Sequence, residues 1–174
     1  MLRANANATG RLLRRWPTWV VAVLFVFNLL EVSAAEVRAS TILHEAIRRR
    51  VTISDGQRQL TLRLNYGDGC VLDQINVRGR DVVSEAGVRT GVRAGEQWFT
   101  TKSAAGARVE VGKDTVTVTG IRFGQPGQEI EETWKFTTRP DQIIWQIKRK
   151  YSADAALEDM AFPEWNFRNL STWT

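Results

Sequence analysis

Acidic side chains are the residues of this 174-residue chain that could most directly do chemistry. Two groups of them are the candidates, namely Glu129, Glu131 and Glu132 in one and Glu158, Asp159 and Glu164 in the other. Hydrolysis of a glycosidic bond needs two carboxyl groups, either about 5 Å or roughly 6.5–9.5 Å apart across the bound sugar. Only their acidity recommends these residues for acid–base work, so we assign no catalytic residue.

Glu132 differs from its neighbours in the phase of the strand that should contain it. Glu129 and Glu131 alternate with apolar residues and are expected to face solvent. Glu132 shares the parity of Ile130 and Trp134. We therefore expect it either at the margin of a sheet or buried and paired, with an arginine as the natural partner.

Tryptophans are the second candidates, because their flat apolar faces can stack on sugar rings. Trp134 and Trp145 alternate in phase with Ile and Phe, which favours a place in the core for both. Trp98 and Trp165 lie nearer to expected loops. Together with Glu164 they are the residues that we name as candidate sugar-binding residues.

Metal and cofactor chemistry find no support in the sequence. His44 is the only histidine, which excludes a multi-histidine metal site and an ordinary Ser-His-Asp triad. Cys70 is the only cysteine and begins an apolar stretch, so we expect a small buried side chain. The glycines of 87–91 and 120–127 neither open a helix nor end in Lys-Ser/Thr, and no phosphate-binding loop is indicated. We expect no cofactor and no metal.

The elements that must position these residues are β-strands, because apolar residues recur with period two after residue 50. Alternating runs cover 59–66, 71–77, 109–111, 115–119, 130–137 and 142–148, and 98–101 has strand-like composition. A helical turn is permitted at 46–48. Val116 and Val118 differ in parity from Ile121 and Phe123, which predicts a β-bulge at Thr119-Gly120.

The last two runs predict a hairpin of long antiparallel strands on either side of Arg139-Pro140-Asp141. About eight or nine short strands without an intervening helical pattern are typical of an all-β sandwich. The fold class expected is therefore an antiparallel β-sandwich, preceded by the helix of a signal peptide.

The first 35 residues resemble a secretory signal peptide. Arg3 and three further arginines precede an apolar run at 19–30, and the small residues Val32-Ser33-Ala34-Ala35 follow it. The run is shorter than the ~20 residues that a membrane-spanning helix needs, so cleavage after Ala34 or Ala35 is favoured over a retained membrane anchor at 19–30. We expect a periplasmic or extracellular protein that meets the membrane only transiently.

The charge that remains after removal of this segment gives no support for nucleic-acid binding. Subtracting its four arginines and Glu31 from 24 basic and 19 acidic residues leaves 20 and 18, a net charge of +2. Binding to nucleic acid would need clustered positive charge. The two dense basic runs, Arg48-Arg49-Arg50 and Lys148-Arg149-Lys150, are expected to be solvated strand edges.

The final segment is unusually apolar, with Phe162, Trp165, Phe167 and Trp173 near the end of the chain. Such residues either pack on the sandwich or lead into a partner domain, and we favour the second. The expected organisation is a signal peptide at 1–35, a lead-in segment at 36–50, the sandwich at 51–151, and at 152–174 a connector with the start of a further domain.

The order of these patterns resembles a known domain. The carriers are Ile130-Glu131-Glu132-Thr133-Trp134-Lys135-Phe136, then Ile143-Ile144-Trp145-Gln146-Ile147, and then Phe162-Pro163-Glu164-Trp165-Asn166-Phe167. Over about residues 45–174 the chain is similar to the N-terminal β-supersandwich of large bacterial glycosidases, rhamnosidase-like or glucoamylase-like. There an (α/α)6 six-hairpin barrel follows the sandwich and carries the catalytic carboxylates.

The resemblance implies an exported, non-catalytic accessory domain of a glycoside hydrolase, with the helical catalytic domain of the same parent protein or a glycan as its partner. A stand-alone secreted or periplasmic module that binds glycans or proteins is the main alternative. A third possibility is a structural protein held in the membrane by residues 19–30. An open reading frame downstream of codon 174 would distinguish the first from the second.

Overall fold

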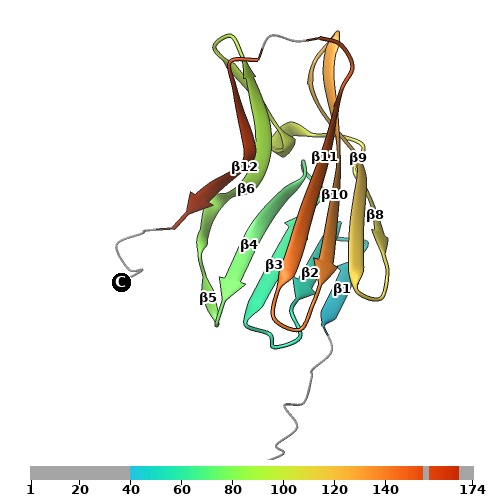
Figure 1. Ribbon diagram of the computed structural model, residues 1–174, viewed down its shortest axis with the longest axis vertical. Helices are drawn as coiled ribbons and strands as arrows, with labels where there is room; N and C mark the ends of the chain where they lie inside the picture. The colour runs from blue at the N-terminus through green and yellow to red at the C-terminus, as the bar shows by residue number, and fades with distance from the viewer. Residues whose placement is uncertain (1–39, 155–156, 169–174) are drawn as a thin grey trace, which may run out of the picture. The chain divides into compact units, whose positions relative to one another are not determined.

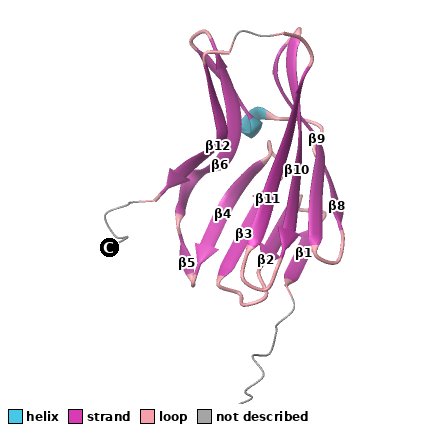
Figure 2. Ribbon diagram, in the orientation of Figure 1, coloured by secondary structure: helices cyan, strands magenta, loops and turns pink. Residues whose placement is uncertain are grey.

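The computed structural model describes residues 40–154 and 157–168. Within them the chain is all-β, with antiparallel strands and a single 3-10 turn at Thr101–Ser103 (Figure 2). The expected signal-peptide helix at 1–35 and the alternative anchor at 19–30 lie outside the described residues.

The larger sheet, sheet A, has eight strands, and its main path runs β1-β2-β3-β4-β6-β12. Two short strands lie off this path, since β5 pairs with β4 and β7 pairs with β6. The strands of sheet A are β1 (Thr41–Glu45), β2 (Arg50–Ser54), β3 (Leu60–Asn65), β4 (Val71–Val77), β5 (Arg80–Asp81), β6 (Val83–Ala94), β7 (Gln97–Thr100) and β12 (Asp159–Phe167).

The smaller sheet, sheet B, has four strands in the order β11-β10-β9-β8. They are β8 (Arg108–Val111), β9 (Thr115–Gln125), β10 (Gln128–Thr138) and β11 (Ile143–Tyr151). The two sheets face one another as the layers of a sandwich (Figure 1). The predicted antiparallel sandwich is confirmed, and its described strands number twelve where the sequence indicated about eight or nine.

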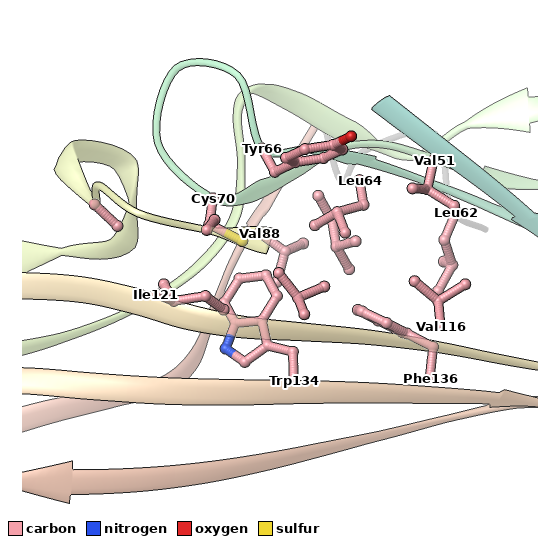
Figure 3. Close-up of a cluster of buried hydrophobic side chains, with 14 of the residues drawn as sticks. Val51, Leu62, Leu64, Tyr66, Cys70, Val88, Val116, Ile121, Trp134 and Phe136 are labelled. Carbon is pink, nitrogen blue, oxygen red and sulfur yellow. The ribbon is translucent and has the colours of Figure 1, made fainter. Parts of the chain in front are cut away.

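The core lies between the sheets and follows the predicted alternation. Val116, Trp134 and Phe136 from sheet B are fully buried against residues of β2, β3 and β6 (Figure 3). Val118 is fully buried as well. Trp134 meets Phe136 edge to face, with ring centroids 6.4 Å apart. Aromatic pairs in this geometry stabilise a core by more than their buried area alone.

The bulge expected at Thr119-Gly120 is present. The β9–β10 register shifts between Glu132 and Trp134, which pair with Ile121 and Val118, so two residues of β9 oppose one of β10. Gly120 has φ of +66°, a conformation that other residues rarely adopt. The shift turns Ile121 and Phe123 back toward the core, where both are buried.

Several elements differ from their sequence-based expectations. Residues 46–49 form a turn as permitted, but a strand, β1, precedes it and pairs with β2. The glycine-punctuated stretch after Val83 is one continuous strand, β6. Residues 159–167 form β12, which pairs with β6, so the sandwich extends beyond the boundary expected at residue 151. A strand built largely from non-alternating residues gives no period-two signal.

β4 departs from the alternation read along 71–77. Leu62 pairs with Ile75 but Leu64 pairs with Leu72. The β3–β4 register therefore shifts at this point, and Asp73 has no paired residue on β3. Leu72 and Ile75 are the buried residues of this strand, whereas Val77 is 41% exposed. Asp73 instead accepts a hydrogen bond of 2.7 Å from Arg63 Nε, which explains why an acid is tolerated within an apolar run.

Candidate functional site

An apolar groove with a volume of about 500 Å³ opens between the two sheets. Volumes of this order are typical of binding sites. Its lining residues come from β3, β4 and β12 of sheet A, from Val82, and from β11 of sheet B. The thirteen lining residues are Leu60, Leu62, Leu72, Ile75, Val77, Val82, Ile143, Trp145, Ile147, Phe162, Pro163, Trp165 and Phe167.

The groove exists because sheet B ends at β11 while sheet A continues through β4, β6 and β12. In a closed sandwich the apolar face of the larger sheet would be covered. Here Val77, Phe162, Trp165 and Phe167 remain 38–48% exposed. Contiguous exposed apolar surface of this kind marks sites of interaction with other molecules.

Trp145 lines the groove and also packs against aromatic residues of the core. Its ring stacks on Phe136 with centroids 5.4 Å apart and meets Trp134 edge to face at 4.8 Å. The two tryptophans predicted to be core therefore differ, because Trp134 is fully buried and Trp145 is only partly so. The indole N–H of Trp145 is buried and has no hydrogen-bond partner.

Glu132 is fully buried and accepts hydrogen bonds from three side chains. Its Oε1 accepts from Arg149 Nε at 2.6 Å, directly across the β10–β11 pair. Its Oε2 accepts from Thr90 Oγ1 at 2.7 Å and from Trp134 Nε1 at 2.6 Å. The second of the two expectations for Glu132, burial beside an arginine, is the one observed. A carboxylate occupied in this way is structural.

Arg149 corrects the expectation that the run 148–150 is a solvated edge. Its side chain is only 5% exposed, because it shares the parity of Trp145 and Ile147. The guanidinium also donates to the carbonyls of Gly91 and Ala161, both at 3.4 Å, and lies 4.7 Å from the ring centroid of Phe162. It therefore ties β10 and β11 to β6 and β12.

The two candidate sugar-binding tryptophans occupy separate places. Trp98, 43% exposed, lies on β7 opposite Arg93, whereas Trp165 lies on β12 opposite Val88. Among the described residues no ring contact or hydrogen bond joins the two tryptophans. Trp165 instead stacks on Phe167 with centroids 5.7 Å apart, inside the groove.

Glu164 lies between the groove residues Pro163 and Trp165 but does not itself line the groove. Its carboxylate forms an ion pair with Arg89. Arg89 donates from Nε and from a terminal nitrogen to the two carboxylate oxygens, at 2.9 and 3.1 Å. This bidentate contact lowers the pKa of Glu164, against the opposing effect of partial burial. The geometry is that of an ion pair between β6 and β12, and no second carboxylate faces it in the groove lining.

Cys70 is fully buried, as predicted. Burial raises the pKa of its thiol well above the ordinary range, and the negative charge of Glu132 acts in the same direction. A thiol held in the protonated form is a poor nucleophile. His44 is exposed and its Nε2 lies 2.7 Å from the hydroxyl of Tyr66, and neither residue lines the groove.

Within residues 40–154 and 157–168, no cluster of His, Cys, Asp or Glu side chains could hold a metal ion. In the same residues, no helix has the length and apolarity needed to cross a membrane. Comparisons of the chain with protein-family models, with curated proteins and with solved structures found no match.

The groove itself was missed by reasoning from the sequence. Its floor residues on β3 and β4 read as ordinary core positions, because periodicity shows which side of a strand is apolar but not whether anything covers it. One signal in the sequence did point to it. Edge strands usually carry charged residues that prevent association, whereas residues 159–167 are rich in apolar side chains.

Proposed function

We propose that this chain is a non-catalytic β-sandwich accessory module of a carbohydrate-active enzyme, similar to a supersandwich domain, and that it acts by docking another polypeptide against its apolar groove. The observation that carries the proposal is the lining of that groove. None of its thirteen residues has a carboxylate, amide, hydroxyl or cationic side chain.

A polypeptide suits this lining better than a glycan does. Sugar sites combine aromatic faces with polar groups that fix the orientation of hydroxyls. The groove offers Trp145 and Trp165 but surrounds them with aliphatic side chains. Burying hydroxyls there without partners costs several kcal/mol per group on apolar transfer scales. Apolar side chains of a protein partner carry no such penalty.

The absence of a catalytic role for this domain is supported by the state of its carboxylates. Glu132 is buried and bonded to Arg149, Thr90 and Trp134. Glu164 is paired with Arg89. Glycoside hydrolysis needs two carboxyl groups on opposite sides of the bound sugar. Neither Glu132 nor Glu164 is free to act as one of such a pair. In the proposed enzyme the reacting carboxylates belong to the partner domain.

One observation favours the alternative of a glycan-binding module. The rings of Trp165 and Phe167 are nearly parallel, at 13°, and both are partly exposed. Such a stack could serve as a platform for a sugar ring. Binding of oligosaccharides to this chain, lost in Trp165→Ala, would support this second function.

The docking role is tested with the polypeptide encoded downstream of codon 174, expressed separately and added to this chain. We expect binding that Val77→Lys abolishes, because the lysine would place a charge in the groove. Val111→Lys is the matched control, since Val111 is also a 41%-exposed strand valine but lies on β8. Equal binding by both variants would contradict the proposal, and a closed reading frame together with glycan binding would favour the module.

A further inference from the structure

We propose that the occupant of the groove is an extended segment that adds as a strand to the free edge of β11, with apolar side chains facing sheet A and acidic side chains facing outward. This inference rests on the proposed docking function and names the chemistry of its partner. Three features of β11 support it.

The first feature is the direction of the backbone groups. Ser152 N donates to the Glu129 carbonyl and Arg139 N to the Gln142 carbonyl, so both are hydrogen-bonded pairs of the β10–β11 ladder. In an antiparallel pair such positions alternate. The even-numbered residues of β11 therefore point their N–H and C=O groups toward β10. Ile143, Trp145 and Ile147 point theirs away from it, along the edge of sheet B.

The second feature is that these same three residues line the groove. A strand hydrogen-bonded to them would extend sheet B over the uncovered part of sheet A. Every second side chain of that strand would enter the groove, because side chains alternate across a sheet. This is recognition by strand addition, in which main-chain hydrogen bonds give affinity and pockets select alternate side chains.

The third feature is the charge on the opposite face of β11. Lys148 and Lys150 are exposed there, and Lys135 of β10 lies opposite Gln146. Within the described residues no lysine takes part in an ion pair.

The acids on this face of β10 offset only part of this positive charge. Glu131 lies directly opposite Lys150, but its carboxylate forms its ion pair with Arg122 at 3.0 Å. Lys148 lies opposite Thr133, and Glu129 lies opposite Ser152, beyond the end of β11. Acidic residues at alternate positions of the added strand would lie beside Lys148 and Lys150, and opposite charges on neighbouring strands stabilise the pair.

The same lysines disfavour a second copy of this chain as the occupant. Pairing of two β11 edges would bring Lys148 and Lys150 of both copies to one face of a joined sheet. Like charges on adjacent strands are destabilising, and lysines on edge strands protect proteins from such self-pairing. The basic face therefore selects an acidic partner over the chain itself.

The experiment measures binding of synthetic peptides to the protein as it is recovered after expression of the full chain. The probe is a short capped peptide in which leucine alternates with glutamate. One control peptide alternates leucine with lysine, and another has the composition of the probe in block order. We expect the probe to bind at least tenfold more tightly than either control.

Variants of β11 separate strand addition from simple occupation of the groove. Ile147→Pro removes an outward N–H that the β10–β11 ladder does not use, a change that edge strands tolerate. Ile147→Ala is the control, because it shortens the same side chain and keeps the N–H. We expect proline to abolish probe binding and alanine to weaken it only several-fold. The double variant Lys148→Glu, Lys150→Glu should reverse the preference toward the lysine peptide.

The outcomes distinguish this inference from the function on which it rests. Equal binding of the three peptides, or equal binding by Ile147→Pro and Ile147→Ala proteins of native circular dichroism, would overturn strand addition. If Val77→Lys still abolished binding of the downstream polypeptide, docking in the groove would remain supported. Self-association of the chain that Ile147→Pro abolishes would make a second copy the occupant and would also overturn the inference.

Discussion

At the scale of single residues, one ion pair in the described part of the chain is buried. Glu132 and Arg149 face each other across β10 and β11, and their shared contacts reach into both sheets. A buried ion pair adds little net stability over apolar residues of the same volume, but removal of one partner leaves an uncompensated charge. Its contribution is therefore visible chiefly when only one partner is changed.

We expect Arg149→Met to lower the free energy of unfolding by about 3–5 kcal/mol, the cost of stranding a buried charge. The double variant Glu132→Gln, Arg149→Met should be less destabilised than the sum of the single variants. Urea unfolding followed by tryptophan fluorescence measures both. Lys148→Met, an adjacent exposed change, should stay within about 0.5 kcal/mol of the parent. Additive losses in the double variant would contradict the pairing.

Glu164 makes a pH-dependent contribution through its contact with Arg89. Because the pKa of this carboxyl is lowered in the folded state, the stabilisation is present above the pKa of the unfolded chain. It is lost as the pH falls through the lowered folded pKa. The pair is partly exposed, so solvent screening limits the effect to about 1 kcal/mol or less.

Thermal unfolding of Glu164→Gln and the parent protein should therefore differ near neutral pH and converge in acid. The comparison is of the difference between the two proteins, since the parent itself will lose stability in acid through other carboxylates. A difference that stays constant across the acid range would mean that the Arg89 contact does not stabilise the carboxylate form.

At the scale of elements, the two strands of the β10–β11 hairpin have different roles. β10 contributes buried residues to the core, and β11 contributes residues to the groove lining. Trp134 is enclosed on all sides, whereas Trp145 has one face toward the groove. We expect Trp134→Ala to cost about 3–5 kcal/mol, as for other large aromatic truncations in a core. Trp145→Ala should cost clearly less, and chemical denaturation of the two variants in parallel measures the difference. A larger loss at Trp145 would show that the groove is closed in solution.

Much of this hairpin could be predicted from the sequence, because alternation fixes which side of a strand is apolar. On the neighbouring strand β9, the bulge at Thr119-Gly120 followed from a change of parity at a glycine. Arg149 could not be predicted in the same way. The composition of Lys148-Arg149-Lys150 indicated solvent, and only the position of Glu132 on the neighbouring strand makes its burial favourable.

At the scale of the whole described molecule, the two sheets were predictable and their unequal width was not. Strand order depends on pairings between residues far apart in sequence, such as β12 with β6, which period-two patterns do not encode. The groove is a consequence of that order, because its lining comes from β11 and from strands of sheet A. Figure 1 shows the strands of sheet A continuing past β11, the edge strand of sheet B. A candidate site of this kind becomes visible only after the strands are placed.

The central claim is that the free edge of β11 is a docking edge, and residue-resolved amide hydrogen exchange tests it most directly. In the free protein we expect rapid exchange at Ile143, Trp145 and Ile147, and slow exchange at Ile144, Gln146 and Lys148, whose N–H groups face β10. Addition of the leucine–glutamate peptide should slow exchange at the first three and leave the others unchanged. Exchange at Trp145 and Ile147 that is slow in the free monomer, or unaltered by bound peptide, would contradict the claim.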